Sequence, residues 1–465
     1  MSKVDLLVVG AGPAGMAAAV TARRFGLDVL VVDDQPAPGG QIWRAVETVA
    51  ASSRETILGD AYLAGQSAAE AFRASAAVYQ PGTQLWQIEP GFRAFVTRDG
   101  TARSIEASAV ILATGAQERP VPFPGWTLPG VLTVGAAQIL LKSAGQVPAK
   151  PVWVAGSGPL ALLYLTQLLR AGGQIAGYLD MTPPGRLGAA LPHLPAALRA
   201  AGDLAKGLGW MMALRRRGVR IVKHVIDVEA IGSDQIEAIR YRTAGGEQKT
   251  VAADILLVHE GIVPNIHAPL ALGCKVQWRD DQDCYVPILD PWGESSQASV
   301  FIAGDAAGIA GAKAAVIGGE LAALKVAVKL RRAGEAEAGA AATPLRHRLA
   351  RERALRPFLD AMFRPRAQIF APSDDTIVCR CEEVTARDIR AMAAIGRPGP
   401  NQVKAFTRAG MGPCQGRQCG YTVTRILAQA ENRPAADVGF YRVRPPLKPV
   451  TLGELASLDR LETTP

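Results

Sequence analysis

Residues 3–33 read KVDLLVVGAGPAGMAAAVTARRFGLDVLVVD, and this stretch decides the fold. The near-continuous apolar run 3–9 predicts a strand that is buried on both faces. A glycine-rich turn at 10–15 leads into a predicted helix, and a second predicted strand ends just before Asp33. Glycines allow the tight turn and let a pyrophosphate approach the helix amino terminus, while the acid can accept hydrogen bonds from a ribose. The stretch therefore predicts a dinucleotide-binding unit.

A second copy of this pattern begins near residue 151. Residues 152–155 predict a strand, and GSGPLA at 156–161 predicts the turn, with alanine in place of the third glycine. The copy fits either a working site for NAD(H) or ATP, or a retained scaffold that binds no nucleotide. An acid at the end of the next strand favours a free ribose 2′-hydroxyl over a 2′-phosphate. The candidate residues are Gly156, Gly158, Ala161 and Asp180.

Two shorter motifs also end predicted strands. ATG occupies residues 113–115, and GD occupies residues 304–305 before a helix start that is rich in glycine and alanine. Small residues permit close approach to a flat ligand, and Asp305 can hydrogen-bond a polyol hydroxyl. Each motif is weak alone, but their order after the first unit is informative.

With PGGQ at 38–41, these motifs occur in an order that resembles the flavoprotein oxidoreductases with two dinucleotide-binding domains, such as the glutathione and thioredoxin reductases. The resemblance covers about residues 1–330 and implies an α/β fold with two Rossmann-like domains. The first cysteine is Cys274, so the paired-cysteine chemistry of those reductases is excluded. The resemblance places FAD against Gly10, Gly12, Pro13, Ala14, Asp33, Gly40, Gln41, Ala113, Thr114, Gly115, Gly304 and Asp305.

Four of the six cysteines lie in the last quarter of the chain, which indicates ligation. Their C-x-C and C-x4-C spacing resembles bacterioferritin-associated ferredoxin, a small helical domain that holds a 2Fe-2S cluster. The ligands implied are Cys379, Cys381, Cys414 and Cys419. A four-thiolate zinc site is the alternative, although zinc sites mostly use C-x2–4-C pairs. Thr385 and Asp388 predict a helix N-cap beside the first pair. Cys274 and Cys284 are interpreted as ordinary thiols.

The whole chain resembles the FAD-binding A or alpha subunits of heteromeric bacterial dehydrogenases. That group includes opine oxidases, D-hydroxyproline dehydrogenase, dye-linked L-proline dehydrogenase and hydrogen cyanide synthase. VHEGIVPN at 258–265, GDAAGIAGAKAA at 304–315 and the proline-rich tail support the resemblance. It implies an FAD and 2Fe-2S subunit that relays electrons to an acceptor from a partner beta subunit, which is similar to D-amino-acid oxidases. The partner would oxidise the C–N bond of an amino acid, imino acid or opine, and a small ferredoxin-like gamma subunit is a further candidate partner.

Other functions remain open at this point. The second glycine turn would also suit a stand-alone NADH-dependent flavoprotein reductase, or a nucleotide-binding structural subunit. No residue stands out as a catalytic group for an amine substrate. Nucleic-acid binding is disfavoured, because the sequence has no recognised module or interleaved aromatic and basic stripe.

The net charge of +9 is concentrated in one segment. Residues 325–366 contain 11 Lys or Arg and 4 Asp or Glu, so the rest of the chain is nearly neutral. The basic segment is either a solvated helix face or a docking surface for an acidic partner or for cofactor phosphates. No secretory signal is evident, because the predicted strand 4–9 begins almost at the amino terminus with no basic region before it. The uncharged stretch 152–169 contains a glycine–proline turn, so it is interpreted as a strand, turn and helix and not as a transmembrane segment. We therefore expect a cytoplasmic protein.

The motif positions predict the order of the domains. The low-complexity stretch 334–342 predicts a linker or frayed helix, and the tail from 443 predicts an extended segment followed by a short capped helix. The expected domains are FAD-binding at 1–124 and 262–332, second nucleotide-binding at 125–261 with a helical insertion near 186–218, basic connector at 333–372, 2Fe-2S domain at 373–435 and Pro-rich tail at 436–465.

Overall fold

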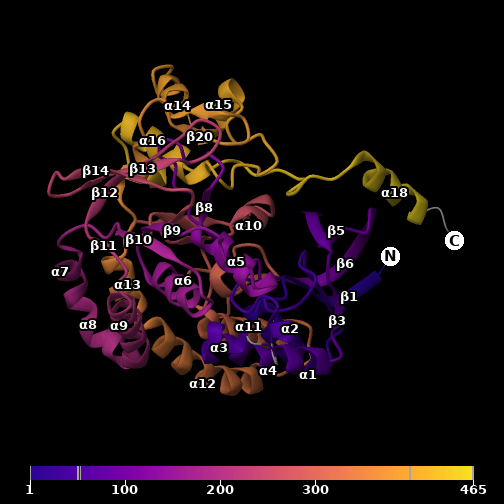
Figure 1. Cartoon of the computed structure of the whole chain (residues 1–465). Helices are drawn as coiled ribbons and strands as arrows, with labels where there is room; N and C mark the ends of the chain where they lie inside the picture. Colours follow the sequence, from indigo (N-terminus) through magenta and orange to yellow (C-terminus); the bar gives the residue numbers. More distant parts are fainter. Residues whose placement is uncertain (1, 50–51, 53, 397–398, 463–465) are drawn as a thin grey trace.

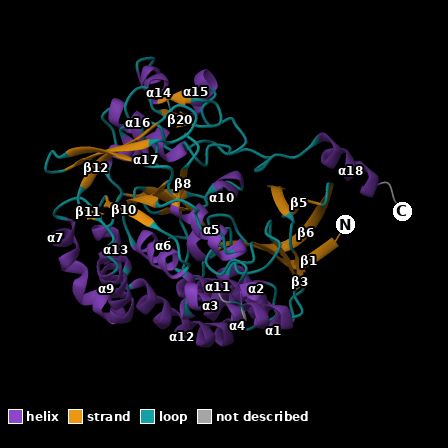
Figure 2. Ribbon diagram, in the orientation of Figure 1, coloured by secondary structure: helices purple, strands orange, loops and turns teal. Residues whose placement is uncertain are grey.

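The computed structural model describes residues 2–49, 52, 54–396 and 399–462. Two parallel sheets with flanking helices form the body, and the last quarter of the chain forms a helical lobe above the second sheet (Figures 1 and 2). Buried side chains of both sheets, such as Val8 and Val154, belong to one continuous apolar cluster. The predicted α/β fold with two Rossmann-type units is therefore confirmed.

The first sheet has the strand order β3-β2-β1-β6-β5-β4, with β19 pairing with β6. Its parallel part consists of β1 (Ser2–Val9), β2 (Val29–Val32), β3 (Val78–Gln80), β6 (Thr101–Leu112) and β19 (Val300–Ile302). β4 (Gln84–Ile88) and β5 (Arg93–Arg98) are antiparallel additions. The second half of β1, Leu6–Val9, and all of β2 are buried, which explains why the sequence shows no polar alternation there.

Helices cover the first sheet. α1 (Pro13–Arg24) and α11 (Ala312–Lys329) pack against each other through small residues, for example where Gly319 meets the backbone of Ala14. The remaining helices of this part are α2 (Val46–Val49), α3 (Arg54–Leu58), α4 (Asp60–Ala74) and α10 (His267–Ala271).

The second sheet has the order β11-β10-β9-β15-β8, and all its pairings are parallel. Its strands are β8 (Val131–Thr133), β9 (Val152–Gly156), β10 (Ile175–Asp180), β11 (Ile221–Val222) and β15 (Leu256–His259). Its helices are α5 (Val134–Ala144) and α6 (Pro159–Arg170), and a separate antiparallel sheet contains β12 (Val225–Ile231), β13 (Ala238–Thr243) and β14 (Gln248–Ala252). The uncharged stretch 152–169 is thus divided between a strand and a helix. Across the described ranges, every helix is too short or too polar to cross a membrane.

Two short strands join the units. β7 (Ala116–Glu118) follows the first sheet, and β16 (Ile262–Pro264) follows the second, and the two pair antiparallel. The chain therefore leaves the first unit and returns to it at adjacent points. The hairpin of β17 (Val276–Arg279) and β18 (Cys284–Pro287) follows.

Helices also extend the second unit and connect it to the last lobe. The predicted insertion contains α7 (Arg186–Ala190), α8 (Leu194–Ala197) and α9 (Ala201–Arg216). The connector contains α12 (Glu335–Arg353) and α13 (Arg356–Met362), and α13 packs on α7. Residues 334–342 were expected to be a linker or frayed helix. Apart from residue 334, they form the first half of α12 instead, because Ala338 and Ala342 are fully buried there and pin the helix to the body.

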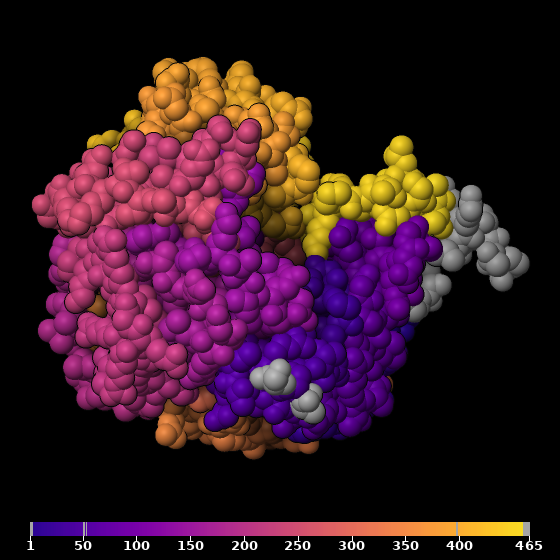
Figure 3. All heavy atoms as spheres, viewed as in Figure 1, coloured from indigo at the N-terminus to yellow at the C-terminus, as the bar shows by residue number. Residues whose placement is uncertain are grey.

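The carboxy-terminal lobe has its own apolar core. Its elements are β20 (Ile377–Cys379), β21 (Val384–Thr385), α14 (Ala386–Ala393), α15 (Pro400–Thr407), α16 (Gly420–Ala430) and α17 (Ala435–Val438). The tail then runs back to the first sheet and ends in α18 (Leu452–Glu462), drawn in yellow at the edge of the body (Figures 1 and 3). The Thr451 hydroxyl accepts the Glu454 amide hydrogen bond at 3.2 Å, which confirms the predicted capped helix.

Candidate functional site

The glycine turn after β1 lies against two other predicted motifs. Gly10 has φ 104°, and a Cβ there would lie 2.5 Å from the carbonyl oxygen of Ala113. A Cβ on Gly40 would lie 2.9 Å from the Cα of Gly12. Only glycine tolerates such backbone contacts. The structure therefore brings the turn 10–15, the PGGQ loop and the ATG turn into one cradle.

Helix α1 presents its amino terminus to this cradle. Pro13 occupies its first turn, which contains no acidic residue, and the Gly12 N-cap has no side chain that could cap the amides. The first intrahelical bond runs from the Met16 amide to the Gly12 carbonyl at 3.0 Å. The first-turn amides, including that of Ala14, can therefore bind an anion such as a pyrophosphate.

Asp33 lies at the end of β2 beside the same turn. Its carboxylate accepts hydrogen bonds from the amides of Ala11 and, at 2.7 Å, Gln35. Burial raises its pKa, and these amide bonds oppose that rise. Each carboxylate oxygen can accept a further bond, so Asp33 both fixes the turn and remains able to bind a ribose hydroxyl.

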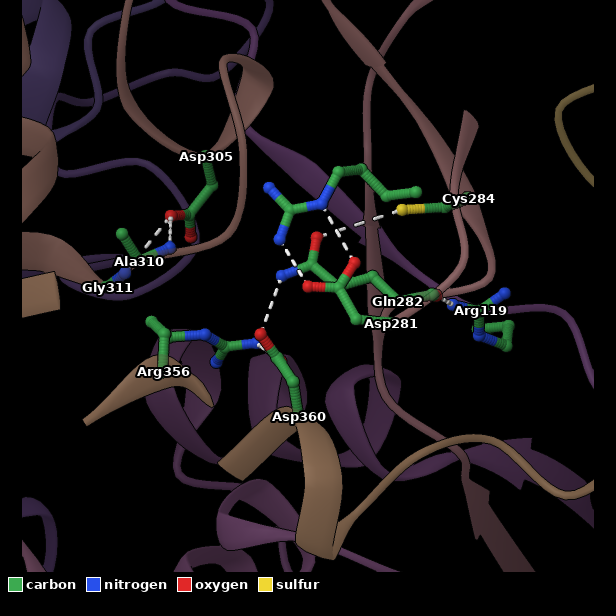
Figure 4. Close-up of polar contacts among 10 residues, drawn as sticks. Arg119, Asp281, Gln282, Cys284, Asp305, Ala310, Gly311, Arg356 and Asp360 are labelled. Carbon is green, nitrogen blue, oxygen red and sulfur yellow. Dashed lines mark hydrogen bonds and ion pairs between the residues drawn. The ribbon is translucent and has the colours of Figure 1, made fainter. Parts of the chain in front are cut away.

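Asp305 and Gly304 complete the opposite wall. Asp305 Oδ1 accepts hydrogen bonds from the amides of Ala310 at 3.0 Å and Gly311 at 3.1 Å (Figure 4). A Cβ on Gly304 would lie 2.9 Å from the Cβ of Ala14, so the GD motif sits on the start of α1. The cradle fits FAD, because it combines glycines that allow close backbone contacts, a helix amino terminus without a side-chain cap, and two acidic side chains.

Two residues that the sequence did not predict support this cradle. Asn265 Nδ2 donates to the Thr114 carbonyl at 3.0 Å, and the Asn265 amide donates to the Gly115 carbonyl at 3.0 Å. Lys142 Nζ donates to the Gln41 carbonyl at 3.1 Å. Burial lowers the pKa of Lys142 to about 7, and nearby Arg44 contributes. The VHEGIVPN string contains Asn265, whereas no sequence signal pointed to Lys142.

The second glycine turn has tight backbone packing. A Cβ on Gly156 would lie 2.3 Å from the His259 carbonyl oxygen, and Ala161 is fully buried. Asp180 Oδ1 accepts the Thr182 amide hydrogen bond at 3.0 Å. Phe363 lies near the turn, since its ring would be 3.8 Å from a Cβ on Gly158.

Two buried polar pairs lie at the carboxyl end of β15. His259 Nδ1 is 2.7 Å from Glu118 Oε1, and Glu118 Oε2 accepts the Gly135 amide hydrogen bond at 2.8 Å. The next residue, Glu260, accepts a 2.6 Å hydrogen bond from Arg366 Nε. These pairs join β7, α5 and the connector to the second sheet. Both His259 and Glu260 occur in VHEGIVPN, but their partners are far away in the sequence.

The four carboxy-terminal cysteines come together as two thiol pairs. Cys379 ends β20, and Cys419 is the N-cap residue of α16; both are buried. A hydrogen bond from Cys419 lowers the pKa of Cys379 to about 6, and the same contact raises the pKa of Cys419. Cys381 is exposed and hydrogen-bonds Cys414, although burial of its thiol contributes most to its raised pKa. No group of three or more His, Cys, Asp or Glu side chains within the described ranges is arranged to hold a metal ion.

The loops around the two thiol pairs pack closely against the cysteine side chains and supply hydrogen-bond donors to them. A Cβ on Gly412 would lie 2.2 Å from the Cβ of Cys381. The Gly410 amide donates to the Cys379 sulfur at 3.5 Å, and the Tyr441 hydroxyl is 3.7 Å from the Cys419 sulfur. Amide and hydroxyl donors stabilise thiolates and cluster sulfurs. The two pairs of free thiols, with these donors, are the candidate ligands of the predicted 2Fe-2S cluster, which takes two thiolates at each iron.

The structure also tests the predictions for the two remaining cysteines and for the helix cap at Thr385. Cys274 and Cys284 are both buried, and burial raises the pKa of Cys284 to about 11. A thiol with such a pKa is a poor nucleophile at neutral pH. Thr385 and Asp388 form the predicted reciprocal cap of α14.

Comparison with known proteins gives the family. Residues 4–319 match the pyridine nucleotide-disulphide oxidoreductase family, and residues 373–458 match the sarcosine oxidase A3 domain. The opine oxidase A-subunit of Agrobacterium tumefaciens (strain Ach5) is 46% identical over 98% of this chain and 92% of its own length. The HcnB subunit of hydrogen cyanide synthase from Pseudomonas aeruginosa is 33% identical over 97% of this chain and 98% of its own length.

A solved structure has the same fold over nearly the whole chain. The L-proline dehydrogenase from P. horikoshii superposes with a TM-score of 0.73 and 20% identity, covering 97% of this chain and 79% of that chain. The cradle, the two Rossmann-type units and the full-length relatives agree, and the predicted resemblance to the FAD-binding subunits of heteromeric oxidases is confirmed. The ferredoxin-like assignment of the last lobe stays a prediction. The chain therefore belongs to the family of the opine oxidase A-subunits and is an FAD-dependent oxidoreductase.

Proposed function

We propose that this chain is the electron-transferring subunit of a heteromeric oxidase that acts on the C–N bond of an amino acid, imino acid or opine. The observation that carries the proposal is that one chain joins an FAD cradle to a four-cysteine centre. Gln117, just after the ATG turn, hydrogen-bonds the carbonyl of Arg417, which lies between the last two cysteines. FAD accepts two electrons together and can release them singly, whereas a 2Fe-2S cluster carries one at a time.

Different residues of the cradle would bind different parts of FAD. The amides at the start of α1 would bind the pyrophosphate, and Asp33 would accept hydrogen bonds from the adenosine ribose. Asp305 would hydrogen-bond the polyol chain, and Lys142 would hold the PGGQ loop through the Gln41 carbonyl. The proposed FAD contacts are Gly10, Gly12, Pro13, Ala14, Asp33, Gly40, Gln41, Ala113, Thr114, Gly115, Gly304 and Asp305.

The four cysteines are the proposed cluster ligands. Their thiols are free of disulfides and lie as two hydrogen-bonded pairs, and the Gly410 amide and the Tyr441 hydroxyl are donors to one of these pairs. Measuring iron, acid-labile sulfide and zinc in the purified chain tests this assignment. A cluster predicts equal iron and sulfide that are lost in Cys414→Ser but retained in the control Cys274→Ser. Zinc without sulfide would contradict it.

Amine oxidation is assigned to a partner. Relatives are named as the A-subunits of opine oxidases, and we infer that this chain likewise assembles with a flavin subunit similar to D-amino-acid oxidases. A small ferredoxin-like gamma subunit is a further candidate. The proposed domains are an FAD-binding domain at 1–124 and 262–332, a second nucleotide-binding domain at 125–261 with a helical insertion near 186–218, a basic connector at 333–372, a 2Fe-2S domain at 373–435 and a Pro-rich tail at 436–465. Six unpaired cysteines favour a reducing, cytoplasmic compartment.

The second glycine turn supports a second candidate function, an NADH-linked reductase. Gly156, Gly158, Ala161 and Asp180 would bind NAD(H) or ATP. Rapid mixing with NADH decides between the two functions, because fast bleaching of the flavin would favour the reductase.

The division of labour has a direct test. The chain is purified with and without its co-expressed flavin subunit, and its flavin absorbance is followed anaerobically after an opine or proline is added. We expect reduction only in the complex. Full-rate reduction of this chain alone would contradict the proposal.

A further inference from the structure

The loop between the third and fourth cysteines, residues 414–419, lies against the wall of the FAD cradle. Gln117 Nε2 donates to the Arg417 carbonyl at 2.9 Å, and His267 Nε2 is 3.1 Å from the Gln415 carbonyl oxygen. Gln117 lies in β7, two residues after Gly115. The buried His267 ring is two residues from Asn265, which hydrogen-bonds the last two carbonyls of the ATG turn. Two short hydrogen-bonded routes therefore connect the cradle with the cysteine loop.

The side chain of Arg417 extends this junction in a second direction. Its Nη1 donates to the Cys414 carbonyl at 3.2 Å, and its Nη2 donates to the Leu447 carbonyl at 2.9 Å. The Leu447 amide in turn donates to the Trp86 carbonyl of β4 at 2.7 Å. One guanidinium thus ties a proposed cluster ligand to the tail, and the tail is tied to the first sheet.

Neighbouring tail contacts lead to the adenosine end of the cradle. Lys448 forms an ion pair with Asp34, the residue after the ribose-binding candidate Asp33. Val450 and Leu458 pack against Trp86 and Phe95. The tail is therefore held at several points along the FAD-binding unit, and Arg417 is where the cysteine loop joins it.

We propose that Arg417 is a positioning residue that fixes the cysteine loop at a set separation from the flavin and tunes the cluster by its charge. This role rests on the proposed electron relay. With both groups bound, each exchange would oxidise the flavin by one electron and reduce the cluster by one, and it would make and break no bond. The rate of such an exchange falls steeply with separation. The Arg417 guanidinium bonds the Cys414 carbonyl and so places a permanent positive charge near a proposed ligand. Such a charge would favour the reduced, more negative cluster and raise its potential.

The test compares full-length Arg417→Met and Arg417→Lys with the wild type. The matched control is Arg390→Met, because Arg390 also donates to a backbone carbonyl of the same lobe, that of Pro372 at 2.6 Å, but bonds neither the cysteine loop nor the cradle. FAD, iron and sulfide are measured first. Cluster potential then comes from a redox titration monitored by electron paramagnetic resonance, and the exchange rate from laser-flash reduction of the flavin.

We expect Arg417→Met to keep FAD, iron and sulfide, to lower the cluster potential and to slow the exchange at least tenfold. Arg417→Lys should restore the potential, and Arg390→Met should match the wild type. Wild-type values in a cluster-loaded Arg417→Met would overturn the role. If Arg417→Met does not fold, Gln117→Met tests the same contact from the cradle side, and an unchanged exchange rate there overturns it. A wild-type chain without FAD or iron is a separate outcome, which overturns the relay itself.

Discussion

At the scale of single residues, close backbone contacts and buried charges determine which substitutions the protein tolerates. Gly10 combines a φ of 104° with a carbonyl 2.5 Å from any added Cβ. Lys142 and Glu260 are buried at 4% and 2% exposure. Each of these positions contacts a group far away in the sequence, so each substitution acts through its own tertiary contact.

Gly10→Ala is expected to abolish FAD binding. The added methyl group meets the Ala113 carbonyl and separates the glycine turn from the ATG turn. The control Gly82→Ala has φ 64° but no atom within 4 Å of the added Cβ, so it should cost only about 1–2 kcal/mol of left-handed strain. Flavin content and thermal unfolding distinguish the two. Normal flavin content in Gly10→Ala would contradict the cradle.

The Glu260–Arg366 pair predicts strong coupling. Its side chains are 1% and 6% exposed. Arg366→Met leaves a buried carboxylate without its partner and should cost about 3–5 kcal/mol, whereas the double variant with Glu260→Gln should recover most of that loss. Urea unfolding of the two single variants and the double variant measures the coupling. Additive losses would refute it.

Lys142 predicts a rise in stability with pH. Its pKa is about 7 in the folded chain and about 10.5 when unfolded, so the unfolded state binds the extra proton between these values. The free energy of unfolding of the wild type should therefore increase relative to Lys142→Met from pH 7 to pH 10. Denaturant titrations at several pH values test this. A constant difference between the two proteins would show that Lys142 titrates normally.

At the scale of elements, the connector helices explain part of the basic segment. Arg346 stacks on the Trp292 ring at 4.4 Å, and Arg364 pairs with Asp283 at 3.0 Å. Such contacts hold α12 and α13 on the body. In contrast, Arg348 and Arg353 lie on exposed positions of α12 and remain candidates for docking an acidic partner.

Reversing both charges, with Arg348→Glu and Arg353→Glu, should weaken assembly with the flavin subunit when the salt concentration is low and have less effect at high salt. The matched control is Arg215→Glu with Arg216→Glu at the end of α9. Binding measured across ionic strengths tests this. An unchanged complex would leave α12 as a solvated helix face.

At the scale of the whole molecule, the units are joined by buried and polar contacts. The two sheets share one apolar cluster, and Trp126 Nε1 donates to the Ile377 carbonyl of the last lobe at 2.7 Å. Tyr421 of that lobe packs with Val263 and Val286 of the body. The units therefore share buried apolar and polar contacts, unlike domains that are connected only by a flexible linker.

The chain should therefore unfold in one cooperative transition. Flavin fluorescence, cluster absorbance and far-ultraviolet circular dichroism should have coincident midpoints in denaturant. Separate transitions for the cluster and the flavin would show that the lobe is independent of the body.

The sequence alone determined the local units of this protein. The turns at 10–15 and 156–161, the caps of α14 and α18 and the cysteine spacing are set by glycine conformations, apolar runs and nearby hydrogen bonds, which a short window contains. Only the tertiary structure decided which distant residues meet. Lys142 reaches Gln41, Glu260 meets Arg366, residues 335–342 become helical against the body, and Arg417 joins the cysteine loop to the tail. These pairings depend on how two sheets and a lobe pack in three dimensions, and no spacing along the chain encodes that packing.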